Sequence, residues 1–343
     1  MLRKDFLRQG LLAALPLLPG EREAAALTES AGDMIVPPAL EPGDTIGISS
    51  PAGYITLAEL QPAIDQIRSW GFKIRLGATI GKRDGTFGGT DEERRADFQQ
   101  LLDDPEVKAI LCARGGYGMV RIIDQIDFSR LRRYPKWMIG FSDVTVLHAH
   151  LNRQCRLASI HSKMCNSFPE LWAAADPMQQ ATILSIRDAL LRKPLSFNIP
   201  PNANNRLGMA VGELIGGNCK TLESLAGSRS DIHTAGKILF LEDTGEYLYS
   251  IDRMFWNLKR SGKLENLAGL IIGGFKVKAS EDPAEEFNRD LYRIVLEKVG
   301  DCSYPLCFDF PVGHQRNNYA LTCGLTLQLD VKMDGVLLQE QKN

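Results

Sequence analysis

Short apolar runs alternate with amphipathic stretches through the first half of the chain. The runs lie within GDTIGISSPAG (43–53), FKIRLG (72–77), VKAILCA (107–113) and WMIGF (137–141), and each predicts a strand. Between the first two, apolar residues recur at helical spacing from Leu57 to Trp70, although Pro62 leaves the start of this helix open. The sequence TDEE at 90–93 has the cap and first-turn residues that open a second helix. Strands that alternate with helices favour a parallel sheet with right-handed crossovers.

The second half of the chain has a mixed pattern. A polar-faced helix is predicted at 176–193, and NIPPNANNR (198–206) is rich in Pro and Asn, as interdomain linkers are. Beyond it, KILFLED (237–243), LAGLIIGGF (267–275) and ALTCGLTLQLDV (320–331) predict strands, and 251–264 predicts a helix. We therefore expect an α/β protein. A parallel-sheet, Rossmann-like domain would occupy 40–175, a helix and linker 176–206, and a mixed, strand-rich α/β domain 207–335.

The N-terminus differs from the rest of the chain. MLRKDFLRQGLLAALPLLPG has a basic start and then an apolar core, and Ala24-Ala25-Ala26 offers a cleavage site. This order is typical of an export signal over residues 1–26, so we expect a periplasmic or otherwise exported protein. The alternative is a leader that stays on a cytoplasmic chain. The order RKDFL at 3–7 resembles a twin-arginine signal with Lys in the second basic place.

Composition excludes several classes of function. The formal net charge is -2 and there is no long basic run, so a nucleic-acid partner is not expected. No stretch reaches the roughly 18 uninterrupted apolar residues of a membrane span. The seven cysteines are scattered, without CxxC or a zinc-ligand spacing, although Cys302 and Cys307 could pair in an exported protein. We expect no metal and no cofactor.

The stretch YPKWMIGFSDVTVLHAHL (134–151) places Ser142 between a predicted strand and a predicted helix. At such a junction the hydroxyl is exposed, and the unpaired N–H groups of the first helical turn can hold an oxyanion. The nucleophile elbow G-x-S-x-G is only half met, because Val144 stands where its second Gly would be. A plain helix N-cap is the alternative role for this serine.

A nucleophilic serine needs a base, and the chain has five histidines. His314 is the best placed, because it follows an apolar run and a short loop, at a strand end where α/β enzymes gather their sites. His161, near another strand edge, stays open. The other three fit a helix surface, a core or a polar loop better: His148, His150 and His233.

The base in turn needs an acid that fixes its tautomer. Glu242, Asp243 and Glu246 all follow the predicted strand at 237–241, and the sequence does not choose among them. The loop Arg114-Gly115-Gly116-Tyr117-Gly118 joins a strand to a helix, and its glycines let backbone N–H groups approach a ligand. Because G-x-G-x-x-G and the P-loop lysine are both missing there, the loop could hold an oxyanion or carboxylate as readily as a phosphate.

Six segments together carry a family resemblance. GDTIGISSPAG, FGGTDEERRADFQQLLDDPEVKAILCARGGYG, IGFSDVT, GELIGGNCKTLESLAG, LFLEDTGE and DFPVGH occur in this order and resemble the LD-carboxypeptidase family, the muramoyltetrapeptide carboxypeptidases. The resemblance implies that Ser142 in the N-terminal domain is the nucleophile. It also implies that Glu242 and His314 in the second domain complete the triad, and that Gly116 and Asp143 supply the oxyanion hole.

The implied activity is that of a serine carboxypeptidase in cell-wall recycling. It would cleave an L,D-peptide bond and release the terminal D-Ala of the peptidoglycan peptide L-Ala-D-Glu-diaminopimelate-D-Ala. The expected partners are this muropeptide and a second copy of the chain in a homodimer. Two alternatives remain: a muropeptide-binding protein without activity, and a related serine peptidase that acts on a peptide antibiotic. HSKM at 161–164 replaces the H-G-P-M common in the family, which leaves the substrate preference open.

Overall fold

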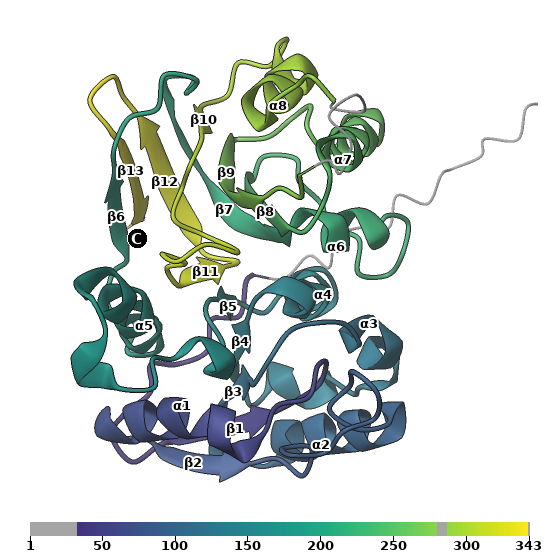
Figure 1. The fold of residues 1–343 in the computed structure, drawn as a ribbon, viewed down its shortest axis with the longest axis vertical. Coiled ribbons are helices and arrows are strands. Elements are labelled where there is room, and N and C mark those ends of the chain that lie inside the picture. The colour runs from purple at the N-terminus through teal and green to yellow at the C-terminus, as the bar shows by residue number, and fades with distance from the viewer. Residues whose placement is uncertain (1–32, 280–286, 342–343) are drawn as a thin grey trace, which may run out of the picture. The chain divides into compact units, whose positions relative to one another are not determined.

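The computed structural model describes residues 33–279 and 287–341 (Figure 1). The export signal expected at 1–26 lies outside these residues. The strands are β1 Thr45–Ser49, β2 Lys73–Leu76, β3 Val107–Cys112, β4 Trp137–Gly140, β5 Ser159–His161, β6 Ser196–Ile199, β7 Gly208–Asn218, β8 Ile238–Thr244, β9 Gly269–Lys276, β10 Leu306–Cys307, β11 Leu321–Cys323, β12 Thr326–Val331 and β13 Val336–Glu340. The α-helices are α1 Leu57–Ser69, α2 Asp91–Asp103, α3 Met119–Ile122, α4 Thr145–His150, α5 Pro177–Leu190, α6 Cys219–Ser224, α7 Leu248–Arg260 and α8 Leu291–Val299.

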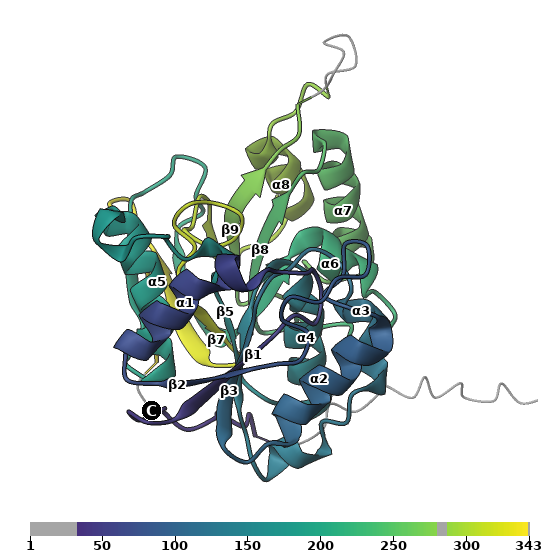
Figure 2. The same ribbon diagram turned by 60° about the horizontal axis from the view of Figure 1, so that its bottom comes forward.

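The first sheet has the strand order β11-β5-β4-β3-β1-β2, and β1 to β5 run parallel. Apart from β11, this is the doubly wound order 2-1-3-4-5, in which the loops at the carboxyl ends of the strands form a crevice for ligands. Figure 2 shows α1 and α5 on one side of this sheet and α2, α3 and α4 on the other. The predicted parallel α/β sheet is confirmed.

Local capping explains where the first two long helices begin. Thr56 and Glu59 form a capping box before α1, and Thr90 and Glu93 form another before α2. In each box the Thr hydroxyl accepts from the Glu backbone N–H while the Glu carboxylate accepts from the Thr N–H. Helix α1 therefore starts at Leu57, and Pro62 lies inside it, where the sequence left the start open.

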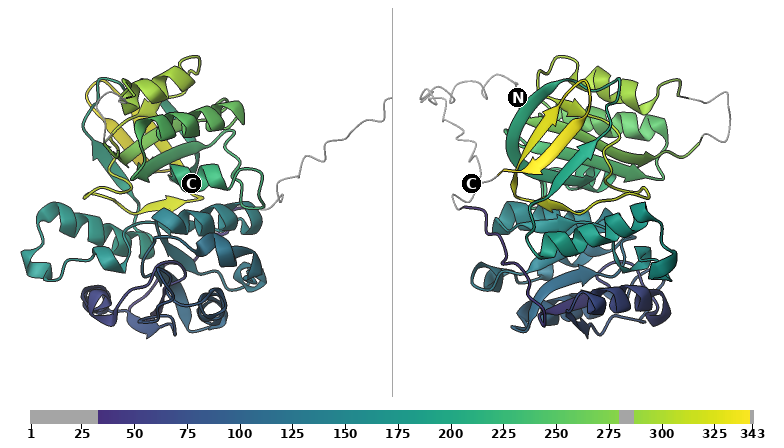
Figure 3. Two further views of the ribbon diagram at one scale, coloured as in Figure 1. Left: turned by 45° about the vertical axis from the view of Figure 1, so that its right-hand side comes forward. Right: turned by 90° about the vertical axis from the view of Figure 1, so that its left-hand side faces the viewer.

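The second sheet is mixed, with the strand order β10-β9-β8-β7-β12-β13-β6. Strands β7 to β10 run parallel, whereas β12, β13 and β6 run antiparallel to their neighbours. Helices α7 and α8 pack on the parallel half of this sheet (Figure 3). Their buried residues, such as Phe255 and Ile294, join one apolar cluster with Leu239 and Ile272 of β8 and β9. The expected strand-rich α/β arrangement is confirmed. Among the residues that the structure describes, no helix combines the length and apolar character needed to cross a membrane.

One strand prediction in the second half was wrong, and the predicted linker starts later than expected. The segment 320–331 was expected to form one strand, but it divides at Gly324, whose φ of +93° ends the extended backbone. β11 then pairs with β5 of the first sheet, and β12 pairs with β7 of the second. The predicted linker at 198–206 begins inside β6, which pairs with β13. In both cases pairing with a distant strand decided the structure.

The carboxyl ends of the two parallel strand sets meet at a close backbone contact. The backbone N–H of Asn218, at the end of β7, donates to the hydroxyl of Thr145 at the start of α4 over 3.0 Å. The neighbouring Gly217 has φ of +143°, and a Cβ added there would lie 2.5 Å from that hydroxyl oxygen. Only glycine fits at this position, which brings loops from both sheets to one place.

Candidate active site

Ser142 lies in a strained turn between β4 and α4. Its φ is +63°, in the left-handed region, which costs a residue other than glycine roughly 1 kcal/mol. A Cβ added to Gly140 would lie 2.9 Å from both γ-carbons of Val144, so the turn is closed tightly around a glycine and the valine that replaces the second Gly of the elbow. The strained backbone points the Ser142 hydroxyl toward a histidine, which is a different role from that of a helix N-cap.

Three side chains from three elements form one hydrogen-bonded chain. The Oγ of Ser142 lies 3.2 Å from Nε2 of His314, and Nδ1 of His314 lies 2.6 Å from Oε2 of Glu242. The same Oε2 accepts the backbone N–H of His314 over 3.1 Å. This is the nucleophile, base and acid arrangement that the resemblance implied, and its members come from both sheets.

A glycine makes this approach of His314 to Glu242 sterically allowed. Gly313 has φ of +99°, and a Cβ there would lie 2.3 Å from Cβ of Glu242. The N–H of Gly313 also donates to Oδ1 of Asn318 over 2.8 Å, which fixes the loop after β10. Gly313 and His314 therefore act together. The glycine lets the loop lie against Glu242, and the histidine forms a hydrogen bond with the Glu242 carboxylate.

The structure chooses among the three candidate acids. Glu242 belongs to β8, and its side chain is fully buried. Successive side chains of a strand point to opposite faces, so Asp243 points elsewhere and accepts the N–H groups of Lys220 and Thr244. Glu246 accepts the Ser250 hydroxyl. Burial raises the pKa of Asp243 to about 6, with Glu242 adding to the effect and the two N–H donors opposing it.

The glycine-rich loop after β3 lies against Ser142. A Cβ added to Gly115 would lie 3.0 Å from Cβ of Ser142, and Gly116 has φ of +101°. The carboxylate of Asp143 accepts the N–H of Met119 over 2.8 Å, which ties this loop to the turn that carries the serine. Burial raises the pKa of that carboxyl to about 6. Gly116 and Asp143, the predicted oxyanion-hole residues, line one pocket together with Ser142.

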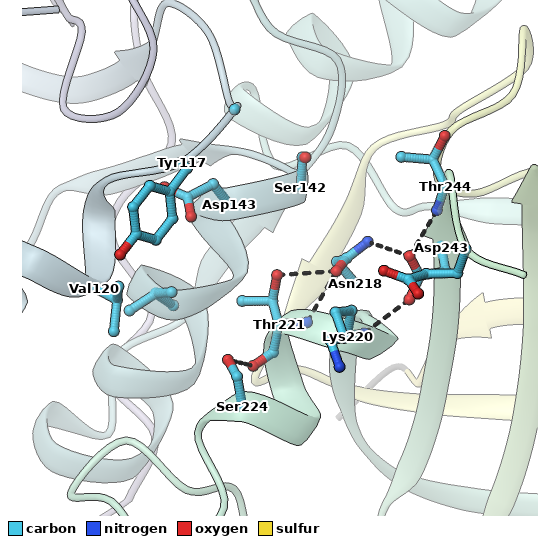
Figure 4. Close-up of a pocket in the computed structure, with 13 residues that line it drawn as sticks. Tyr117, Val120, Ser142, Asp143, Asn218, Lys220, Thr221, Ser224, Asp243 and Thr244 are labelled. Atoms are coloured by element: carbon cyan, nitrogen blue, oxygen red, sulfur yellow. Dashed lines mark hydrogen bonds between the residues drawn. The ribbon is translucent and has the colours of Figure 1, made fainter. Parts of the chain in front are cut away.

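This pocket has a volume of about 290 Å³, and most of its lining residues have polar side chains. Figure 4 shows Tyr117 and Ser142 contributed by the loops of the first sheet, and Asn218 and Asp243 contributed by the second. The remaining lining residues are Val120, Val146, Lys220, Thr221, Ser224, Thr244 and Glu246, with Gly116 and Asp143 already named. No role was assigned to the segment GGNCKTL (216–222) from the sequence. Its signal was an Asn after two glycines at a strand-to-helix turn, and Asn218 does cap α6 by accepting the N–H of Thr221.

The other histidines occupy different positions. His148 is buried between the Ser159 hydroxyl and the Gly140 carbonyl, and burial lowers its pKa to about 4, as expected of a core residue. His150 is buried beside Ser230, and His233 lies exposed in a loop. His161 is fully buried, and its Nε2 lies 4.0 Å from Oε1 of Glu242. His161 therefore lies next to Glu242 on the side away from Ser142, while His314 faces Ser142.

The cysteines form no disulfide among the described residues. All seven cysteines are free, including Cys302, whose thiol faces the Leu264 carbonyl, and Cys307, whose thiol faces the Phe308 carbonyl. Within residues 33–279 and 287–341, no cluster of three or more His, Cys, Asp or Glu side chains has the arrangement of a metal site.

Comparison with known proteins gives matches along both halves of the chain. The model of the LD-carboxypeptidase N-terminal domain matches residues 46–162, and that of the LD-carboxypeptidase C-terminal domain matches 211–329. A probable murein peptide carboxypeptidase of Bacillus subtilis (strain 168) is 34% identical over 295 residues, which cover 84% of this chain and 89% of the relative. The microcin C7 self-immunity protein MccF of Escherichia coli is 26% identical over 332 residues, covering 87% and 94%.

A solved structure agrees with these matches. The crystal structure of muramoyltetrapeptide carboxypeptidase from Oxalobacter formigenes has a TM-score of 0.77 and 27% identity, over 87% of this chain and 99% of that one. The first matched domain contains Ser142, and the second contains Glu242 and His314. The family resemblance seen in the sequence is confirmed, and this chain belongs to the LD-carboxypeptidase family.

Proposed function

We propose that this carboxypeptidase is a serine-type LD-carboxypeptidase that releases the terminal D-Ala from peptidoglycan-derived tetrapeptides. The observation that carries the proposal is the hydrogen-bonded chain from Ser142 through His314 to the buried Glu242, beside a polar pocket. The names of two similar proteins, a murein peptide carboxypeptidase and a muramoyltetrapeptide carboxypeptidase, support the substrate class.

In the acylation step, Oγ of Ser142 attacks the carbonyl carbon of the bond between diaminopimelate and D-Ala. His314 Nε2 accepts the hydroxyl proton, and Glu242 accepts the Nδ1–H that the positively charged ring retains. The amides of Gly116 and Asp143 donate to the carbonyl oxygen as it becomes negative. His314 then gives its proton to the leaving amine, and D-Ala departs.

Deacylation reverses the roles of the same groups. A water molecule attacks the acyl carbon while His314 removes its proton, and the proton passes to Oγ of Ser142 as the acyl–oxygen bond breaks. Full burial keeps the Glu242 carboxylate in one position throughout both steps. The products are D-Ala and the shortened tripeptide, and the enzyme returns to its starting state.

The direct test is mass spectrometry of muropeptides after incubation with the purified protein. We expect the tetrapeptide to lose the mass of one alanine residue, and we expect Ser142→Ala to leave it intact. A tetrapeptide with L-Ala at its end is the control for the L,D bond. If the wild-type protein leaves the D-Ala peptide unchanged, the proposed substrate is wrong.

The similarity to a microcin self-immunity protein motivates a second candidate, a serine peptidase that acts on a peptide antibiotic. Incubation with an aminoacyl-nucleotide amide, followed by the same mass measurement, separates the two activities. A binding protein without activity is a third reading. It would bind muropeptides but would fail to react with a fluorophosphonate at Ser142, because that reaction requires an activated serine.

We also propose that the mature protein is exported and forms a homodimer. The basic start, apolar core and Ala24-Ala25-Ala26 site support export, with a mature chain that begins near Leu27. Sedimentation of the purified mature protein tests the dimer, which predicts twice the mass of one chain.

A further inference from the structure

The buried side chains of His161 and Glu242 face each other on the side of Glu242 away from His314. On that side, neither side chain has a hydrogen-bond partner in the described part of the chain. Both ring nitrogens of His161 and the Oε1 atom of Glu242 are unpartnered within the described residues. His161 and Glu242 are both fully buried, and Nε2 of the one lies 4.0 Å from Oε1 of the other. Buried polar atoms almost always have hydrogen-bond partners, so these unpartnered atoms require an explanation.

The surroundings of His161 explain why Glu242 is the group it can serve. The ring packs edge-on against Phe240 at a centroid distance of 4.9 Å and against Phe141 at 5.9 Å. The His148 ring lies at 6.2 Å but uses its own nitrogens on Ser159 and Gly140. Aromatic rings therefore fill the space around His161, and the carboxylate of Glu242 is the acceptor on its Nε2 side.

The two oxygens of Glu242 have different environments. Oε2 accepts both the Nδ1–H and the backbone N–H of His314, whereas Oε1 points toward His161. A buried carboxylate with one oxygen unpaired is costly, and a single additional donor removes that cost. A neutral imidazole has one N–H to give.

We propose that His161 is a positioning residue for the triad, which donates its Nε2–H to Oε1 of Glu242, directly after a small side-chain rotation or through one bound water. His161 thus positions Glu242 through Oε1, while His314 contacts it through Oε2. This inference rests on the proposed function in one respect only, the role of Glu242 in orienting His314.

Among the described residues, Glu242 is the one acidic group placed against His161 and favours its charged form, but burial outweighs it and favours the neutral ring. Burial lowers the pKa of His161 well below its usual value, and nearby His148, His314 and Lys163 act in the same direction. The ring therefore stays neutral at working pH and cannot replace His314 as the base. Its effect on the reaction passes through Glu242.

Removing the donor should move the pH profile in a definite direction. Without it the Glu242 carboxylate is less stabilised, so it holds the shared proton of the His314–Glu242 pair more strongly. The acid limb of the rate then moves to higher pH, by about one unit for the loss of one charge-assisted hydrogen bond. The loss of rate falls on kcat, because His161 lies behind the acid and away from the pocket lining.

Two substitutions show whether Nε2 or Nδ1 of His161 is the nitrogen that positions Glu242. The amide nitrogen of His161→Gln falls near Nε2 of the histidine, and that of His161→Asn falls near Nδ1. We expect His161→Gln to keep its rate within about threefold and the wild-type pH profile. We expect His161→Asn to lose about 10- to 100-fold in kcat with little change in KM, and its acid limb to move to higher pH. His150→Gln, which alters a buried histidine beside Ser230, is the control and should match the wild type.

The rate of fluorophosphonate labelling at Ser142, measured against pH, provides a readout that does not depend on the peptide substrate. If the wild type labels but releases no D-Ala, the proposed substrate fails while the role of His161 is still tested. NMR of 15N-histidine-labelled wild-type protein adds a measurement without any variant, and we expect His161 to carry its proton on Nε2. Equal rates and pH profiles for the Asn and Gln variants, or a proton on Nδ1 alone, would overturn the inference.

Discussion

Nδ1 of His314 lies 2.6 Å from Oε2 of Glu242, although the two residues are 72 positions apart in the chain. The carboxylate is fully buried, and the histidine is partly exposed toward the serine. A carboxylate in this position selects the tautomer in which Nδ1 carries the proton and Nε2 is free to accept one. In the proposed mechanism, the contact therefore prepares His314 to act as the base before substrate arrives.

The triad residues should act as one unit. Ser142→Ala, Glu242→Ala and His314→Ala should each reduce kcat by at least about 10³-fold while leaving the fold intact. The double variant Ser142→Ala/His314→Ala should lose little more than either single variant, because the removed groups serve the same step. Steady-state kinetics on the tetrapeptide measures this, with circular dichroism as the check on folding. Near-normal rates for His314→Ala, together with inactive His161→Ala, would show that the base is misassigned.

Gly313 should be essential for stability as well as activity. In Gly313→Ala the new Cβ would lie 2.3 Å from Cβ of Glu242. The alanine would also have to keep the φ of +99° that the glycine adopts. We expect the free energy of unfolding to fall by roughly 3 kcal/mol or more, as overpacking and backbone strain combine. Gly236→Ala is the matched control, because φ there is +71° and a Cβ built there meets no atom of the other described residues within 4 Å, so only strain of about 1 kcal/mol is expected. Urea unfolding of the two variants compares them, and equal losses would contradict the steric account.

Asp243 should make the protein less stable as the pH rises. Its pKa is raised from 3.8 to about 6 by burial, so its contribution to stability is fully present below pH 3.8 and is lost as the pH rises through about 6. The shift corresponds to at most about 3 kcal/mol. In Asp243→Asn, the free energy of unfolding should therefore fall less between pH 4 and pH 7 than in the wild type. Urea unfolding at several pH values tests this, and an unchanged slope would show that the carboxyl stays ionised in the fold.

Activity should survive prolonged EDTA treatment and dialysis. His and Glu side chains can both bind zinc, but a catalytic zinc site needs three protein ligands, and here His314 and Glu242 are bonded to each other. A strained serine at a strand-to-helix turn also has no task in a simple mechanism of metal-bound water. D-Ala release should instead be lost on covalent modification of Ser142. Loss of activity with the chelator and recovery with zinc would overturn the serine mechanism.

Export should leave a mature chain that begins near Leu27. The apolar core and the Ala24-Ala25-Ala26 site motivate this prediction, since both match the order of a cleaved signal. N-terminal sequencing of active protein from the native cell tests it, with the cytoplasmic fraction as the comparison. An active soluble pool that still begins at Met1 or Leu2 would contradict it.

Much of this protein follows from local sequence. Short apolar runs predicted β1 to β4. The Thr–Glu pairs at 56–59 and 90–93 mark helix starts, because capping involves only neighbouring residues. The junction at Ser142 is local in the same sense, because a strand, a glycine and a helix lie within one short stretch. Family resemblance then selected Glu242, which the residues alone left open, and agreed with His314, which the residues already favoured as the base.

The tertiary structure decided everything that depends on which distant segments meet. Glu242 and Asp243 are adjacent in the sequence but point to opposite sides of β8, and only the placement of that strand shows which one reaches His314. Likewise β11 and β12 look like one alternating strand, because period two shows which side chains share a face but carries no information about the partner strand. The position of His161 behind Glu242 has the same origin, since burial and distance between residues far apart in the chain arise only when the sheets pack.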